Sequence, residues 1–425
     1  MADTWCAVPL WLSETEATAS LGVASLSVSA VATVDLASPM GDEMHTALRA
    51  AAQDGPTAID AVSGAVIVLG HDDVNRLAHD FRVAGVGLAV FDLLEIGDGP
   101  LRRWYSGIMF TNEGGPHDRL RKLVSRAFTP RAVEALRPEA AALATSLLGT
   151  VRRDGGGDLN SAFARLPMQV MCRLLGVPPD TVDEFAAWAD ALSVVSLFMT
   201  PEQIQTAASA IDELLAYVGR LVDRRRVDPG ADLISALLEA EADGSKLTRD
   251  EVVAMVANLL VAGHDTTASQ LACTLHTLLR HSDQFARVRE DRSLLPHAVA
   301  ETIRFEPSIG FVPRTAIEPV LVGVEVPAGA LMFLCTASAN RDPAVWVDGD
   351  VVDVARFADG KAPRLLSFGA GAHYCLGAAL ARLTLEEGVR AVLDLGPIRA
   401  TEEPALVPWR LLLGRAPQRV IAELA

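Results

Sequence analysis

The sequence predicts a mainly α-helical fold with small β-sheets at its edges. Alanine and leucine, which favour helices, dominate a chain of 425 residues of which half are hydrophobic. Apolar residues at helical spacing run almost without interruption from residue 134 to 292, whereas alternating strand patterns are confined to short segments. Because no linker rich in proline, glycine or serine divides the chain, we expect one domain over residues 39–425, preceded by a poorly ordered extension over residues 1–38.

Short segments bounded by turn residues account for the expected strands. Residues 56–70 predict a hairpin, residues 314–334 predict a second strand-rich region, and residues 409–424 predict another hairpin around Gly414. The helical region is interrupted by three turn sequences, at residues 154–158, 178–179 and 228–230.

Charge and cysteine usage exclude several classes of function. The formal net charge of −17 makes nucleic acid an unsuitable partner. Five cysteines are widely spaced without a CxxC pair, which argues against a disulfide framework or a zinc site and fits a reducing cytoplasm. The segment 21–37 is too short and too weakly apolar for a membrane anchor, and Glu14 and Glu16 before it argue against a signal peptide. We therefore expect a cytoplasmic protein.

A long helix carries an unusual polar segment in its middle. Thr248 and Glu251 form a capping box, and the helix that follows should reach about His281. Its centre reads Ala262-Gly263-His264-Asp265-Thr266-Thr267, and glycine, an acid and β-branched residues are poor choices for a helix interior. A local rule broken in this way often marks a functional site, although a buried helix in which Thr266 bonds back to a carbonyl is also compatible.

A glycine-rich turn around Cys375 opens a second apolar helix, which we expect over residues 376–395. Backbone N–H groups at a helix start favour an anion, and a thiolate is the form of cysteine that binds metals. Chance would reproduce the pattern with a probability on the order of one in a million. The pattern consists of Phe368, Gly369, Gly371, His373, Cys375 and Gly377.

This pattern resembles the haem-thiolate loop of bacterial cytochromes P450, and residues 262–267 resemble that family's oxygen-activation motif. The resemblance implies a cytochrome P450-like fold with haem b (iron protoporphyrin IX) between the long helix and the cysteine loop, and Cys375 as the axial iron ligand. It also implies that Thr266 distorts the helix locally and hydrogen-bonds O2, that Asp265 helps deliver protons, and that Gly263 leaves room for oxygen. Further haem contacts would come from Phe368, Gly369, Gly377 and Ala262.

The resemblance assigns two further groups of charged residues. Glu301 and Arg304, which share a helix face, would join Arg356 in a structural network, although the family more often has Phe where this chain has Val352. Arginine and histidine are suitable partners for the two haem propionates. Four residues match the family's propionate partners: His117, Arg121, Arg314 and His373.

Arg119, Lys122 and Arg126 recur on the short helix that contains His117. In the family, the surface beside the cysteine loop receives a ferredoxin or flavodoxin-like electron donor, which a basic helix face would suit. A solvated helix face without a partner explains the same spacing equally well.

By position in the family, the substrate would lie above the haem in a largely apolar pocket, so we expect a hydrophobic small-molecule substrate. The same side chains are equally compatible with ordinary core packing. The expected lining includes Asn258, Leu259, Ile309, Phe311, Val195 and Phe198.

The implied reaction inserts one oxygen atom of O2 into a C–H or C=C bond. Electrons would come from NAD(P)H through a separate ferredoxin and its reductase. Desaturation, coupling or peroxide-driven oxidation on the same fold is the main alternative, and a haem protein that binds a ligand without turnover is another. The intact pair of Asp265 and Thr266 argues against the peroxide route and has no purpose in a protein without turnover.

Overall fold

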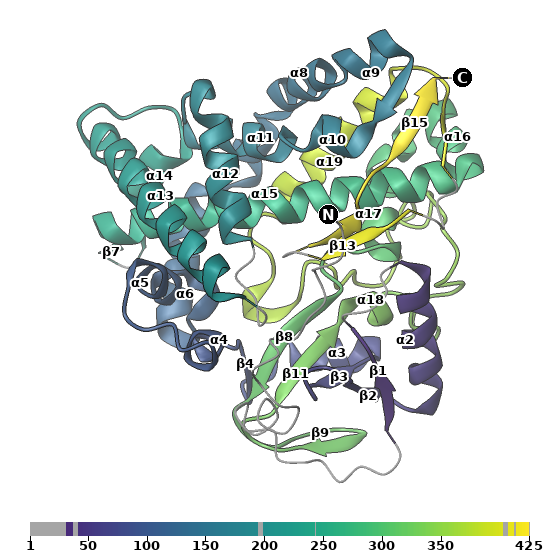
Figure 1. Cartoon of the computed structure of the whole chain (residues 1–425), viewed down its shortest axis with the longest axis horizontal. Helices are drawn as coiled ribbons and strands as arrows, with labels where there is room; N and C mark the ends of the chain where they lie inside the picture. The colour runs from purple at the N-terminus through teal and green to yellow at the C-terminus, as the bar shows by residue number, and fades with distance from the viewer. Residues whose placement is uncertain are drawn as a thin grey trace.

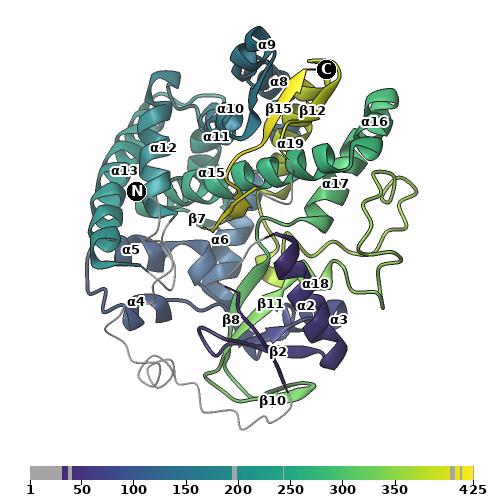
Figure 2. The same cartoon turned by 45° about the vertical axis from the view of Figure 1, so that its right-hand side comes forward.

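The computed structural model describes residues 31–36, 41–193, 199–242, 244–402, 407–411 and 414–424. The long helix α15 (Arg249–Arg280) crosses the middle of the molecule. Most of the other helices lie above and beside α15, and a mixed β-sheet lies below it (Figure 1). The same arrangement is visible after rotation (Figure 2). The predicted class, mainly α with small sheets, is confirmed.

The helices and strands have bounds that follow the sequence patterns closely. The α-helices are α2 (Asp42–Asp54), α3 (His71–Leu77), α4 (Ala89–Leu93), α5 (Pro100–Gly107), α6 (Gly114–Ala127), α7 (Pro130–Glu134), α8 (Arg137–Leu147), α9 (Gly149–Asp154), α10 (Leu159–Phe163), α11 (Leu166–Leu175), α12 (Val182–Leu192), α13 (Pro201–Val227), α14 (Leu233–Glu239), α15, α16 (Ser282–Glu290), α17 (Leu295–Phe305), α18 (Thr336–Ala339) and α19 (Ala378–Leu393). The 3-10 helices are η1 (Met109–Thr111), η2 (Pro179–Thr181), η3 (Arg292–Leu294) and η4 (Gly371–His373). The strands are β1 (Ala32–Val34), β2 (Thr57–Asp60), β3 (Val66–Val68), β4 (Val83–Ala84), β5 (Gly156–Asp158), β6 (Glu241–Ala242), β7 (Ser245–Lys246), β8 (Phe311–Ala316), β9 (Val320–Val322), β10 (Val324–Val326), β11 (Leu331–Cys335), β12 (Ile398–Ala400), β13 (Trp409–Leu411), β14 (Arg415–Pro417) and β15 (Ile421–Leu424).

The largest sheet has six strands in the order β1-β2-β3-β11-β8-β4. The predicted hairpin over residues 56–70 supplies β2 and β3, and β11 pairs with β3 in parallel, with Met332 opposite Val66. Strand β1 lies within the segment expected to be a poorly ordered extension. It pairs in parallel with β2, so the folded domain begins before residue 39.

The C-terminal strands differ in part from the prediction. The hairpin expected around Gly414 forms between β13 and β14, with Trp409 opposite Pro417. The last strand, β15, is not part of this hairpin and pairs instead with β12 and β5. Its edge therefore connects the C-terminal region to residues 156–158, a pairing that local sequence patterns cannot specify.

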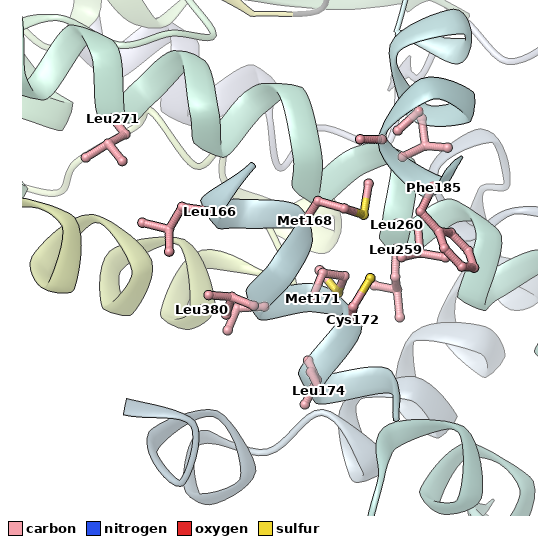
Figure 3. Close-up of a cluster of buried hydrophobic side chains, with 14 of the residues drawn as sticks. Leu166, Met168, Met171, Cys172, Leu174, Phe185, Leu259, Leu260, Leu271 and Leu380 are labelled. Atoms are coloured by element: carbon pink, nitrogen blue, oxygen red, sulfur yellow. The ribbon is translucent and has the colours of Figure 1, made fainter. Parts of the chain in front are cut away.

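The main core surrounds α15, and α11 packs directly against it. Side chains of Met168 and Met171 on α11 interleave with Leu259 and Leu260 on α15 (Figure 3). A Cβ atom on Gly263 would lie 2.6 Å from the Met171 methyl carbon, so this glycine permits close approach of the two helices. The prediction that Gly263 leaves room for oxygen is therefore wrong, because Gly263 faces α11.

Within the described ranges, the structure contains no helix that is both long enough and apolar enough to cross a membrane.

Candidate active site

Cys375 lies in a tight loop immediately before α19. Its backbone N–H donates to the carbonyl oxygen of Phe368 over 2.9 Å, which closes the loop. Gly371 has a φ of 68°, and a Cβ atom there would overlap the carbonyl oxygen of Ala78. The loop conformation and its contact with the end of α3 thus depend on glycine at position 371.

The environment of the Cys375 sulfur acts on the thiol in two opposing directions. The residue has accessible surface, but loss of hydration inside the surrounding protein raises the pKa of its thiol. Backbone N–H groups of Gly377 and Ala378 and the positive charges of Arg121 and Arg382 lower that pKa. Burial has the larger effect, so the pKa of the thiol lies above its usual value. The helix start and the two arginines oppose that rise and thus favour the thiolate, which is the form that binds iron.

Asn258, Ala262 and Thr266 are spaced four residues apart on α15 and therefore share one face of the helix. Ala262 is exposed, and Asn258 and Thr266 are half-buried. The Thr266 hydroxyl donates to the carbonyl oxygen of Ala262 over 2.7 Å, and the Thr266 carbonyl accepts from the Ser308 hydroxyl at 3.3 Å. The helix is continuous from Arg249 to Arg280.

Asp265 points in a different direction from Thr266. Its buried carboxylate accepts from Arg410 Nη1 at 3.1 Å through Oδ1, and from the backbone N–H of Gly414 at 2.9 Å through Oδ2. The Ser269 hydroxyl lies 3.5 Å from Oδ1. The acid is therefore directed toward the β13–β14 hairpin. Sequence reasoning located this hairpin but assigned no role to the arginine beside its turn.

His264, the remaining polar residue of the hexapeptide, is buried rather than exposed to solvent. Its Nε2 atom lies 3.1 Å from Asp190 Oδ1 of α12, and its Nδ1 atom has no hydrogen-bond partner. The contact ties α12 to α15.

Two of the residues assigned to the haem propionates are neighbouring histidines. The rings of His117 and His373 lie 4.3 Å apart. Nε2 of His117 is buried without a hydrogen-bond partner, while its Nδ1 lies 3.0 Å from Asp118 Oδ1. Nε2 of His373 lies 2.9 Å from Glu113 Oε2, and burial lowers the pKa of His373. The Nε2 nitrogen of His117 is therefore a buried polar atom without a protein partner, which a bound group could satisfy.

The other two assigned residues, Arg121 and Arg314, carry charge without a paired carboxylate. Within the described part of the chain, neither forms an ion pair, and burial lowers the pKa of both guanidinium groups. The carboxylate of Glu113 acts on Arg314 through space. Two partly desolvated arginines and the partnerless His117 nitrogen fit a ligand with two carboxylates, as haem propionates are.

The three residues of the expected structural network meet in the interior. Arg304 donates from Nε and Nη2 to the two carboxylate oxygens of Glu301, each over 2.8 Å. Arg356 Nε donates to Glu301 Oε1 over 3.1 Å. Arg304 also donates to the carbonyl oxygens of Asn340, Gly349 and Val351. Both Glu301 and Arg304 are fully buried, so the network fixes α17 to the loop before Cys375.

The expected pocket residues have mixed outcomes. Val195 and Phe198 lie outside the described residues. Ile309 is half-buried, and Leu259 is buried in the core beside Phe185 (Figure 3). Phe311 lies on the opposite face of β8 from Arg314, where its ring is 6.4 Å from that of Phe333.

Val312 shares the face of β8 that carries Arg314 and was not among the expected lining residues. Val312 and Arg314 line one small cavity together with Gly369 of the cysteine loop. Phe311, one residue away from Val312, does not line this cavity. The alternation of a strand, counted back from Arg314, would have identified Val312 from the sequence.

The basic residues of α6 do not act as one surface. Arg119 donates to Glu251 Oε1 over 2.6 Å, to the Ser245 hydroxyl over 2.9 Å and to the Lys246 carbonyl over 2.8 Å. It therefore supports the N-terminus of α15. Lys122 and Arg126 are exposed on α6. If α6 forms a surface for an electron donor, Arg119 is not part of that surface, because its guanidinium is bound to Glu251, Ser245 and Lys246.

Comparison with known proteins agrees with this site. The family model "Cytochrome P450" matches residues 99–394. The chain is 41% identical over 312 residues to the nocardicin C N-oxygenase of Nocardia uniformis subsp. tsuyamanensis, covering 72% of this chain and 76% of that protein. It is 35% identical over 342 residues to the 6-deoxyerythronolide B hydroxylase of Saccharopolyspora erythraea, covering 78% and 82%.

Solved structures show the same fold. The ligand-free P450 monooxygenase TamI superimposes with a TM-score of 0.79 at 32% identity, covering 93% of this chain and 95% of that one. CalO2 superimposes with a TM-score of 0.83 at 27% identity, covering 91% and 98%. Named relatives include monooxygenases and hydroxylases, which are oxidoreductases that incorporate oxygen. With its cysteine loop, its charge network and a family match over most of its length, the chain belongs to the cytochrome P450 family, whose members use haem and O2.

Proposed function

We propose that this protein is a haem-thiolate monooxygenase that hydroxylates or epoxidises an apolar organic substrate. The observation that carries the proposal is the position of Cys375. It lies at the start of α19 in a loop that requires Gly371, beside Arg121, and the N–H groups of Gly377 and Ala378 favour its thiolate. This arrangement suits an iron ligand that donates electron density.

Each of the remaining site residues has a separate task in this proposal. Haem b, when bound, supplies the iron at which O2 is reduced by two electrons. Cys375 ligates that iron, and Arg121, Arg314 and the orphaned nitrogen of His117 hold the propionates. His373 lies against His117 and supports it.

The two residues of the acid–alcohol pair handle protons. Thr266 presents its hydroxyl on the same face of α15 as Ala262, where it can donate to a bound oxygen molecule. Asp265, one residue earlier, is a buried carboxylate held by the β13–β14 hairpin, and it would have to turn away from that hairpin to pass a proton to Thr266. Holding and passing a proton would be the contribution of these two side chains.

The electron source in this proposal is NAD(P)H, acting through a separate ferredoxin and its reductase in the cytoplasm. The exposed side chains of Lys122 and Arg126 support a donor contact, because they extend from the helix whose Arg121 acts on Cys375. An acidic donor would be attracted to these cations even though the whole chain carries a net charge of −17.

For the substrate, we propose an apolar molecule of the kind that relatives oxidise. These relatives include a 6-deoxyerythronolide B hydroxylase and a vitamin D(3) 25-hydroxylase. Solved neighbours include a P450 in complex with mycinamicin IV and another in complex with an acyl carrier protein that bears hexadec-9Z-enoic acid. Val312, which lines a small cavity with Arg314 and Gly369, gives this chain an apolar side chain near the site.

The first test is the visible spectrum of the reduced protein with carbon monoxide. A strongly red-shifted Soret band is expected, because a thiolate donates more electron density to the iron than imidazole does. The Cys375→Ser variant should lose this band, while Cys172→Ala, a buried cysteine on α11, should keep it. A wild-type band at the position typical of histidine ligation would contradict the proposal.

The second test identifies the reaction. The relatives' compounds, 6-deoxyerythronolide B, mycinamicin IV and vitamin D3, are screened for the low-to-high-spin shift that substrate binding causes. The compound that binds most tightly is then turned over under 18O2 with NAD(P)H, a ferredoxin and a ferredoxin reductase. One labelled oxygen atom in the product supports monooxygenation. Loss of two hydrogen atoms without label indicates desaturation, and turnover with peroxide alone indicates the peroxide-driven alternative.

A further inference from the structure

The carboxylate of Asp265 is held from outside its own helix by the β13–β14 hairpin. Arg410 on β13 donates from Nη1 to Asp265 Oδ1 over 3.1 Å and from Nη2 to the Ser269 hydroxyl over 3.2 Å. The backbone N–H of Gly414 donates to Asp265 Oδ2 over 2.9 Å. Both oxygens of the acid are thus occupied by the same hairpin, and its only cationic partner among the described residues is Arg410.

Close approach of the hairpin to α15 is built into the sequence. A Cβ atom on Gly414 would lie 2.9 Å from both Cβ and Oγ of Ser269, which is closer than Cβ contacts occur in proteins. Glycine therefore lets the turn come near enough for its N–H to reach Asp265. The Asp265 side chain is 6% exposed and that of Arg410 is 27% exposed, so the arginine is the member of the pair that reaches the solvent.

We infer that Arg410 is a positioning residue for proton delivery: it holds the Asp265 carboxylate at the β13–β14 hairpin and sets how efficiently that acid serves Thr266. This inference rests on the proposed monooxygenase function. The reaction takes up two electrons and two protons for each O2, places one oxygen atom in the product and releases the other as water. Asp265 would have to receive those protons from solvent, and Arg410, which contacts its carboxylate, is the more exposed member of the pair.

A buried carboxylate depends on its partner both for charge and for direction. Removing one member of such a pair leaves the other desolvated and unpaired, so the carboxylate is no longer held in one direction. This change alters the supply of protons to Thr266 without touching the iron ligand Cys375. General acid catalysis usually raises a reaction rate by a factor of about 10²–10⁴, and a poorly positioned acid loses part of that factor.

The experiment compares Arg410→Gln, Arg410→Lys and the matched control Arg419→Gln in the full-length, haem-loaded protein. Arg419 belongs to the same C-terminal region and pairs with Glu402 at the surface, where both side chains are at least one-third exposed. Turnover uses the compound that gave the strongest spin shift, with a ferredoxin, its reductase and NAD(P)H. The measurements are product formed, peroxide formed, NAD(P)H consumed, the D2O solvent isotope effect and the midpoint of the spin shift.

For Arg410→Gln we expect product formation to fall about tenfold, since the positioned acid supplies at least that factor. Peroxide per NAD(P)H and the solvent isotope effect should rise, and the spin-shift midpoint should stay within about twofold of wild type. Arg410→Lys, which keeps the charge, should recover most of the rate, and Arg419→Gln should match wild type. Unchanged product and peroxide yields in Arg410→Gln would overturn the inference.

A parallel loss of spin-shift affinity and product in both the Gln and Lys variants would also overturn it, because the hairpin would then only shape the pocket. Amide hydrogen exchange at Gly414 in the resting protein is measured as well and does not depend on turnover. It should accelerate in Arg410→Gln and stay unchanged in Arg419→Gln. If wild type forms no product, the proposed function fails, whereas unchanged exchange at Gly414 would contradict the role of Arg410 itself.

Discussion

Replacing Glu301 by glutamine would remove the charge of a completely buried ion pair without changing its size. Arg304 is 0% exposed and would lose the only ionic partner that the described residues give it. Breaking a buried pair in this way costs about 3–5 kcal/mol. An unfolding entropy of about 2.1 cal/mol/K per residue gives about 0.9 kcal/mol/K for 425 residues, so the melting temperature should fall by roughly 3–6 °C.

Differential scanning calorimetry of the haem-loaded protein, at one scan rate for all variants, measures this change. The same substitution at an exposed pair, Glu402→Gln, breaks the contact with Arg419 and should cost less than about 1 kcal/mol, or about 1 °C. Equal melting temperatures for Glu301→Gln and Glu402→Gln would refute the reasoning, because burial would then make no difference to the pair.

Three other predictions concern separate parts of the molecule. Gly371→Ala should release haem, measured as the haem-to-protein absorbance ratio, because a Cβ atom would overlap the Ala78 carbonyl at a φ of 68°. Burial lowers the pKa of His45 from 6.5 to about 4, so only the unfolded chain takes up this proton between those values. The free energy of unfolding should fall by about 3 kcal/mol from pH 6.5 to 4, and His45→Gln should flatten that part of the curve. Arg119→Gln should lower the melting temperature by about 1 °C through lost contacts to Glu251, and leave the rate of iron reduction by a ferredoxin unchanged in stopped-flow measurements with carbon monoxide.

The parts of the fold that local sequence specifies were predictable. The capping box of Thr248 and Glu251 does start α15, and the helix ends one residue before the expected His281. The cysteine loop and α19 follow the glycine spacing, with the helix starting at Ala378. Capping and turn formation depend on residues within a few positions of each other, so one sequence contains the whole signal.

The direction in which a side chain points was the harder prediction. Asp265 and Gly263 were both expected to act at the oxygen site, but one faces the C-terminal hairpin and the other faces Met171. A motif gives the order of residues on a helix, whereas the packing partner of each helix face comes from segments 90 or more residues away. Strand β8 shows the same limit, because neighbouring residues such as Phe311 and Val312 point to opposite faces and a motif does not say which face lines a site.

The pairing of β3 with β11 has a consequence for the order in which the chain can fold. Val66 lies opposite Met332, so β3 has no partner for its outer edge until a further 266 residues have been synthesised. At the usual 5–20 residues per second, this delay is roughly 15–50 s. The helices around α15 can form during that interval from neighbouring segments. The loop of Cys375 rests on Ala78, which follows β3, and emerges later than β11. Haem uptake is therefore expected to be among the last events in the maturation of this protein.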